Sequence, residues 1–231
     1  MKNESQYFHY MEIFPQMFEK PFDAGIELVT DRDHIRDIET TVKSRLREKG
    51  QPEEWADVGV VFQDTYMTVL RDAVIFKPSG VPGTYIRQFN SSSACGVVIL
   101  PIFNGKVCLL RIFRHALRKF AFELPRGFGV DGQTNEENAT RELAEEIGGE
   151  VKELHSLGVI AVDSGIGNIF ASLFFAELQG ELKSSESDEG IDKIMLVSIK
   201  EFLCMIRDGE IYDSFTLAAT VRAVLQGYLK A

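Results

Sequence analysis

The chain of 231 residues contains only three cysteines, at positions 95, 108 and 204, and their spacing matches no zinc motif. An odd number of cysteines also argues against a disulfide framework, so we expect three buried, reduced thiols. No stretch approaches the roughly 18 apolar residues that span a membrane, and the first residues lack the apolar core of a secretion signal. The sequence therefore predicts a cytoplasmic protein without a membrane partner.

Basic residues are also scarce. The chain carries 25 lysine and arginine residues against 35 aspartate and glutamate residues, which gives a formal net charge of −10. Because an acidic surface repels the phosphate backbone of DNA or RNA, we expect no nucleic-acid partner. The remaining composition, with 45% hydrophobic and 26% charged residues, is that of an ordinary globular protein. A small phosphorylated ligand is compatible with this charge where local cations neutralise its site.

Residues 1–50 are predicted to form an aromatic arm followed by a helix. Six aromatic residues lie between Tyr7 and Phe22, and prolines interrupt them, so we expect the arm to pack on the body of the protein or on a second subunit. An apolar stripe with helical spacing predicts the helix over residues 30–49. Residues 51–92 contain short β-type runs separated by turn residues, which predict a small β subdomain.

Residues 93–231 are predicted to form the main domain, in which several strands surround one acidic helix. The nearly continuous apolar run from Ala94 to Phe103 predicts a buried strand. Thr134 and Glu137 have the spacing of a capping box, which predicts where the acidic helix begins, and Gly148 is placed to end it. Further strands and two C-terminal helices are expected after it.

The acidic helix carries three carboxylates that can act together. Glu142, Glu145 and Glu146 are three and four positions apart, so Glu142 stacks against both of the others on one helical face. Carboxylates gathered beside a flexible loop can hold a hard divalent cation, which in turn can hold phosphate oxygens. The alternative is a solvated acidic face, because exposed like-charge pairs cost only about 0.2–0.5 kcal/mol each. Charge alone leaves both interpretations open.

The segment upstream of the helix favours the metal site. It reads Glu123-Leu-Pro-Arg-Gly127-Phe-Gly129, and its glycines permit close approach of the backbone to a bound group. A loop of this type can aim a carbonyl at a metal that the helix holds. Arg114, nine residues before Glu123, is a candidate phosphate ligand because a guanidinium makes forked bonds to oxygen. Glu123 can contact the substrate or pair with Arg114.

From Gly127 onward the chain resembles the Nudix box, which reads G, five residues, E, seven residues, R-E, an apolar residue, one residue, E-E, one residue, G and an apolar residue. The matching residues are Gly127, Arg141, Glu142, Leu143, Glu145, Glu146 and Gly148. Two positions depart from the pattern, since Gln133 stands at the first glutamate and Gly149 at the last apolar residue. The wider similarity is to ADP-ribose pyrophosphatases, over roughly Trp55 to Leu225.

The resemblance implies an α/β fold, a Nudix α/β/α sandwich with a mixed sheet, preceded by a small N-terminal β subdomain and a helix. It implies hydrolysis of the diphosphate linkage of ADP-ribose or a related nucleoside diphosphate sugar to two monophosphates. It also implies a homodimer, for which the aromatic arm and the stripe of helix 30–49 could supply the contact area. The alternative is a Nudix-fold sensor that binds an ADP-ribose-like ligand without turnover, which Gln133 and Ser187 favour.

The resemblance also implies which residues form the site. Glu142, Glu145 and Glu146, with the carbonyl of Arg126, would hold Mg²⁺, with Mn²⁺ as a substitute. Glu145 and Glu146 would be catalytic, and Glu189 in the acidic loop after the box would be the base or a second ligand.

The substrate-binding set expected from the same comparison consists of three charged residues, Arg114, Glu123 and Arg126. Arg126 replaces a small residue that is common in this branch of the family. Arg141 is expected to pair with Glu145 four residues on, and so to orient the ligand set.

Overall fold

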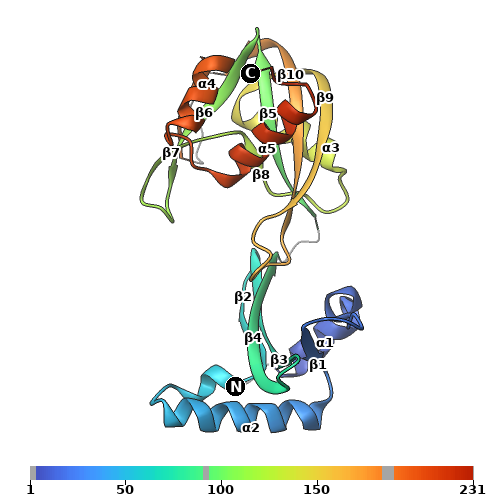
Figure 1. Ribbon diagram of the computed structural model, residues 1–231. Coiled ribbons are helices and arrows are strands. Elements are labelled where there is room, and N and C mark those ends of the chain that lie inside the picture. The colour runs from blue at the N-terminus through green and yellow to red at the C-terminus, as the bar shows by residue number, and fades with distance from the viewer. Residues whose placement is uncertain (1–3, 91–93, 184–189, 231) are drawn as a thin grey trace. The chain divides into compact units, whose positions relative to one another are not determined.

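The computed structural model describes residues 4–90, 94–183 and 190–230. The chain divides into two compact units, residues 1–91 with 163–169 and residues 92–162 with 170–231 (Figure 1). None of the helices within the described ranges is long and apolar enough to cross a membrane.

The first unit is built on a four-stranded antiparallel sheet. Its long strand β3 (Met67–Phe76) pairs with β4 (Val81–Asn90) along one edge, and with β1 (Ile26–Val29) and β2 (Gly59–Gln63) along the other. The helical segments of this unit are α1 (Glu4–Ile13), η1 (Pro15–Phe18), α2 (Arg32–Glu48) and η2 (Glu53–Ala56).

The predicted aromatic arm belongs to the core of this unit. Tyr7 and Tyr10 of α1 are buried in one cluster with Leu70 of β3, which confirms packing on the body. The apolar stripe of α2 is used in the same way, because Ile35 and Ile38 are buried in that cluster too. Burial within their own unit leaves Tyr7, Tyr10, Ile35 and Ile38 little surface for contact with a second subunit, so any such contact falls on other residues of the arm and the helix.

The second unit contains a mixed sheet. Its five longer strands run in the order β11-β6-β5-β10-β9, with β5 and β10 parallel and the other pairs antiparallel. Two short strands complete it, β7 on β6 and β8 on β5. The bounds are β5 (Gly96–Phe103), β6 (Lys106–Arg114), β7 (Lys119–Glu123), β8 (Arg126–Gly127), β9 (Gly148–Ala161), β10 (Phe170–Leu182) and β11 (Ile191–Ser198).

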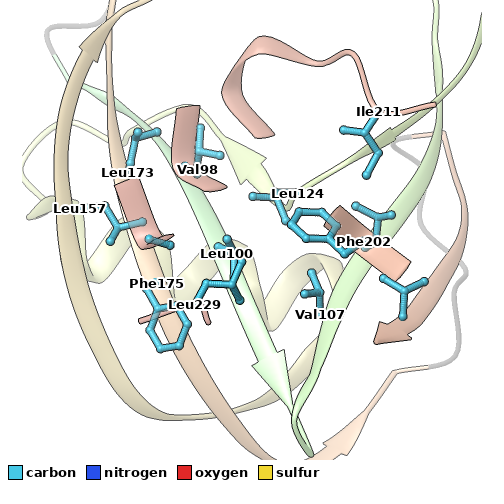
Figure 2. Packing of buried hydrophobic residues seen from close by; sticks show 14 of the residues in the cluster. Val98, Leu100, Val107, Leu124, Leu157, Leu173, Phe175, Phe202, Ile211 and Leu229 are labelled. Atoms are coloured by element: carbon cyan, nitrogen blue, oxygen red, sulfur yellow. The ribbon is translucent and has the colours of Figure 1, made fainter. Parts of the chain in front are cut away.

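Helices cover both faces of this sheet. Because side chains alternate along a strand, Val97 of β5 faces α3 (Asn135–Glu146), and Val98 faces α4 (Ile199–Arg207) and α5 (Ser214–Leu225). Figure 2 shows the apolar cluster on the face covered by α4 and α5, which contains Val98 of β5 and Phe202 of α4. The predicted α/β/α sandwich is confirmed, as are the small N-terminal β subdomain and its helix.

The opening between β5 and β6 positions the site. The two strands pair only next to their hairpin, at Ile102–Val107 and Phe103–Lys106. Beyond that point β6 pairs with β7 and β5 pairs with β8, so the short strands fill the gap. The carbonyl of Pro125, between β7 and β8, accepts the N–H of Ile99 at 2.9 Å. The ends of β7 and β8, Glu123 and Arg126, are thereby held within the sheet.

The three cysteines differ in burial. All are free thiols, but only Cys108 is buried, whereas Cys95 and Cys204 are half-buried. The expectation of three buried thiols is wrong for two of them. Cys95 lies just before the first residue of β5, and Cys204 lies on α4 in an outer layer, so neither is enclosed on all sides.

Candidate active site

The acidic helix α3 begins where the capping box predicts. Thr134 Oγ1 accepts the N–H of Glu137 at 3.1 Å, and Glu137 Oε2 accepts the N–H of Thr134 at 2.7 Å. The buried side chain of Asn138 donates to the carbonyl of Thr134 and accepts the N–H of Val130, each at 3.0 Å. The glycine-rich loop is thus tied to the first turn of the helix. Gly148, with φ of 69°, follows the C-cap and ends α3 as predicted.

Glu142 and Glu146 face the backbone of β8. A Cβ built on Gly127 would stand 2.0 Å from Glu142 Cδ, so the carboxylate occupies the space that any larger residue would fill. Glu146 Oε2 accepts the N–H of Arg126 at 3.1 Å. Glu142 is 6% exposed and Glu146 is 7% exposed. Two buried carboxylates therefore converge on adjacent backbone positions.

Glu145 lies on the outer side of this pair, with its side chain 56% exposed. Arg141 links it to the pair, because Nη1 donates to Glu145 Oε2 and Nη2 donates to Glu142 Oε1, both at 2.7 Å. Nη2 also donates to the carbonyl of Phe128 at 3.1 Å. Burial acts to lower the pKa of Arg141, but the charges of Glu142 and Glu145 outweigh it and raise that pKa. The predicted pairing of Arg141 with Glu145 is confirmed.

Within the part of the chain that the structure describes, no three His, Cys, Asp or Glu side chains are grouped as metal ligands. Arg141 instead joins Glu142 to Glu145, while Glu146 accepts the backbone N–H of Arg126. The chemistry of the three glutamates still fits a hard cation, because they offer only oxygen donors and two of them are more than nine-tenths buried. The lack of a side chain at Gly127 keeps room for the Glu142 carboxylate. In the acidic loop after the box, Glu189, Ser187 and the neighbouring acidic residues lie outside the described residues.

A second charged cluster lies at the ends of β6, β7 and β8. Glu123, only 2% exposed, accepts Arg114 Nε at 3.0 Å and Nη2 at 2.6 Å, and it pairs with Arg126 Nη2 at 2.9 Å. Burial acts to lower the pKa of Arg114, whereas the hydrogen bonds and charge of Glu123 raise it, and the net change is upward. The predicted pairing of Glu123 with Arg114 is confirmed, and the structure brings all three expected substrate-binding residues together.

Sequence reasoning missed two contributors and gave a third only part of its role. Asn138 is a buried amide in the helix, and Phe215 lies under the guanidinium of Arg126, 4.5 Å from ring centre to Cζ. The sequence offers Asp213 or Ser214 as the cap of the last helix; Asp213 is the N-cap of α5, and its Oδ1 also lies 3.7 Å from Arg126 Nη1. Asn138 could have been noticed from the sequence, because it is a polar residue inside the box segment. The contacts of Arg126 with Asp213 and Phe215 join distant segments and depend on the fold.

The mixed sheet between helices, and the acidic helix that follows a glycine-rich loop, have the arrangement that the sequence predicted for a Nudix hydrolase. Residues 94–215 match the NUDIX domain, and the chain belongs to the Nudix family. It is a Nudix hydrolase of the branch that resembles ADP-ribose pyrophosphatases, as the sequence predicted.

Two curated relatives support this placement. The chain is 28% identical over 139 residues to ADP-ribose pyrophosphatase of Bacillus subtilis (strain 168), covering 58% of this chain and 75% of that protein. It is 30% identical over 138 residues to the methanol dehydrogenase activator of Bacillus methanolicus, covering 58% and 74%. A crystal structure of an ADP compounds hydrolase shares the fold, with a TM-score of 0.63 at 21% identity, over 74% of this chain and 92% of that chain.

Proposed function

We propose that the protein hydrolyses the diphosphate linkage of ADP-ribose, or of a related nucleoside diphosphate sugar, with Mg²⁺ as its cofactor. The observation that carries this proposal is the convergence of the buried carboxylates of Glu142 and Glu146 on the backbone of Arg126 and Gly127. The similarity to a B. subtilis ADP-ribose pyrophosphatase supports the choice of substrate.

We assign the cation, Mg²⁺ or Mn²⁺ in its place, to Glu142, Glu145, Glu146 and the carbonyl of Arg126. A bound divalent cation supplies positive charge that polarises the diphosphate and lowers the pKa of a coordinated water. Arg141 holds Glu142 and Glu145 in reach of one another, at 2.7 Å from each. Two of the proposed metal ligands, Glu142 and Glu145, are therefore oriented by a residue of their own helix.

The proposed reaction adds one water molecule across the bridging P–O bond. The water oxygen bonds to one phosphorus, the bond from that phosphorus to the bridging oxygen breaks, and the bridging oxygen leaves with the second phosphate. We assign removal of the water proton to Glu189, from which the proton passes to the leaving phosphate or to solvent. Glu145 and Glu146 are the other proposed catalytic carboxylates. The products are two monophosphates, so atoms and charge balance.

The cluster of Arg114, Glu123 and Arg126 is proposed to bind the phosphates. Glu123 engages Nε and Nη2 of Arg114, and we assign the remaining Nη1 to a phosphate oxygen. The Arg114 side chain is 31% exposed, which leaves it accessible to a ligand. Glu123 is proposed to orient both arginines, because one buried carboxylate holds the two guanidinium groups.

A sensor that binds an ADP-ribose-like ligand without turnover is the second candidate. The observation that favours it is Gln133, which stands exposed at the position of the first glutamate of the box. A glutamine can still accept a hydrogen bond but adds no charge to the carboxylate set.

Phosphate release in the presence of an added phosphatase separates these candidates, because the phosphatase acts on the monophosphate products and not on the intact diphosphate. A panel of ADP-ribose, nucleotide sugars and dinucleotides is tested with and without Mg²⁺. We expect Mg²⁺-dependent release that Glu146→Gln abolishes and that the exposed control on the same helix, Glu136→Gln, retains. Equal rates for the parent and Glu146→Gln would remove Glu146 from the mechanism, and tight ADP-ribose binding without release would establish the sensor.

We also propose that the protein forms a homodimer. The support is a set of large apolar side chains that are exposed in the first unit: Phe22, Trp55, Val61, Phe62 and Tyr66. Sedimentation at micromolar concentration is expected to give twice the mass of one chain. A mass of 26.0 kDa would refute the dimer.

A further inference from the structure

Arg126 has two separate roles within one residue. Its backbone N–H donates to Glu146 Oε2 at 3.1 Å, so its main chain belongs to the carboxylate site. Its guanidinium is bound elsewhere, to Glu123 at 2.9 Å and near Asp213 at 3.7 Å. The side chain is only 23% exposed, and its position therefore constrains the main chain that carries it.

The first turn of α5 forms the anchor for this side chain. Phe215 presents its ring to the guanidinium at 4.5 Å, a cation–π distance. Asp213, the N-cap of α5, places Oδ1 toward Arg126 while its Oδ2 accepts the N–H and the Oγ1 hydroxyl of Thr216, each at 2.8 Å. The two oxygens of one carboxylate thus serve the helix cap and the arginine separately.

A second tie joins the same two segments. The fully buried Thr216 accepts the N–H of Leu124 at 3.1 Å through the same Oγ1 that donates to Asp213. The stretch from Leu124 to Arg126 is therefore held at both ends by the start of α5. Its middle is held from the other side by β5, through the bond from Ile99 to Pro125.

We propose that Asp213 is a positioning residue for the carboxylate site, which acts by holding the guanidinium of Arg126 and so setting where the backbone of β8 meets Glu146. The consequence for catalysis rests on the proposed function, but the positioning itself does not, because it concerns a hydrogen bond present without substrate.

The substitution Asp213→Asn separates the two tasks of Asp213. Asparagine caps helices about as well as aspartate, so the bonds to Thr216 are retained. At 3.7 Å the contact with Arg126 is an ion pair rather than a hydrogen bond, so it depends on the charge that the substitution removes. With the amide oxygen in the cap, the amide nitrogen is a donor facing another donor.

The test is amide hydrogen exchange in the metal-free protein, resolved at position 126. We expect Asp213→Asn to accelerate exchange of the Arg126 amide about fivefold or more, with the unfolding midpoint unchanged. The control is Asp31→Asn, because Asp31 caps α2 through the same kind of bond, to the N–H of His34 at 2.9 Å. Asp31→Asn is expected to leave exchange at Arg126 unchanged. Unchanged exchange in Asp213→Asn as well would overturn the proposal.

Binding of Mn²⁺, followed by its paramagnetic resonance signal, gives a second readout. Loss of residues that orient metal ligands commonly weakens affinity about 10- to 100-fold, and we expect about tenfold for Asp213→Asn. If Asp213 acts through Arg126, adding Asp213→Asn to Arg126→Met produces no further change. Additive effects would show an independent role and refute the proposal. Arg126→Met alone leaves the cap intact and tests the same exchange should Asp213→Asn not fold.

These readouts also separate the inference from the proposed function. Faster exchange at position 126, together with no turnover of any nucleotide sugar by the parent protein, would uphold the positioning role and reject the hydrolase proposal. Turnover of a nucleotide sugar by the parent protein, together with unaltered exchange at position 126 in Asp213→Asn, would uphold the hydrolase proposal and reject the positioning role.

Discussion

The carboxylate of Glu142 stands where a side chain on Gly127 would be, with Cδ 2.0 Å from an ideal Cβ at that position. The conformation of Gly127 is one that other residues adopt, since its φ is not among the positive values. The requirement for glycine here is therefore spatial. Only the absence of a side chain lets the helix place this carboxylate against β8.

Gly127→Ala is predicted to displace Glu142 while leaving the fold intact, because the atoms that must move form the end of one flexible side chain. A misplacement of about 1 Å in a catalytic group can cost about 100-fold, and we expect kcat/KM for the proposed nucleotide-sugar substrate to fall by about that factor. Gly25→Ala is the control, since nothing lies within 4 Å of its Cβ position. Activity equal to that of the parent in Gly127→Ala would show that turnover does not require the Glu142 carboxylate at its observed position against β8.

Arg141 shows how far helical spacing predicts the site. The spacing placed Glu142, Glu145 and Glu146 on one side of α3, and two of them do converge on β8. Glu145 is held by Arg141, which lies one turn earlier, and its side chain remains mostly exposed. Whether a glutamate of this helix turns toward β8 or toward solvent depends on the residues packed around its side chain. The helical spacing in the sequence carries no information about those neighbours.

Arg141→Lys is predicted to keep the charge but lose the fork that joins the two glutamates. A lysine carries a single ammonium group, so it cannot bind Glu142 and Glu145 in the same geometry. We expect turnover to fall about tenfold with little change in the unfolding midpoint. Arg47→Lys removes a comparable fork, to Glu53 on the surface of the first unit, and provides the control. A similar loss in both variants would contradict a specific role for Arg141.

The start of α3 was predictable because its signals are local. Thr134 and Glu137 are three residues apart, and Gly148 follows the last turn, so the sequence contains the whole motif. The strand β8 has only two residues and exists because β5 pairs with it. The contact of Arg126 with Asp213 likewise joins segments that are distant in the chain. Long-range packing creates both features, and no short pattern contains them.

Tyr7→Phe is predicted to destabilise the first unit. Tyr7 is fully buried and its hydroxyl donates to Asp72 Oδ1 at 2.6 Å, while Arg87 binds the same carboxylate. Burial and then the charge of Asp72 raise the pKa of Tyr7, so the hydroxyl remains a donor at neutral pH. Losing a buried hydrogen bond to a charged group is expected to cost about 1.5–3 kcal/mol in free energy of unfolding. Denaturant titration measures this loss, and Tyr66→Phe at an exposed position is expected to cost far less.

The capping box of α3 predicts a dependence of stability on pH. The backbone N–H and the hydroxyl of Thr134 hold the pKa of Glu137 below its ordinary value of 4.5. A lowered pKa means that the folded state favours the charged carboxylate, so this stabilisation is present above pH 4.5 and is lost as the pH falls through the lowered value.

Glu137→Gln keeps the size and the hydrogen-bonding capacity of the side chain but removes the titrating charge. We expect the variant to unfold at a lower temperature than the parent at pH 7, because the parent then has the full benefit of the charge. The difference between the two midpoints should shrink as the pH falls below 4.5, where the parent carboxylate becomes protonated. A difference that persists unchanged into that acidic range would mean that the charge of Glu137 does not stabilise the start of α3.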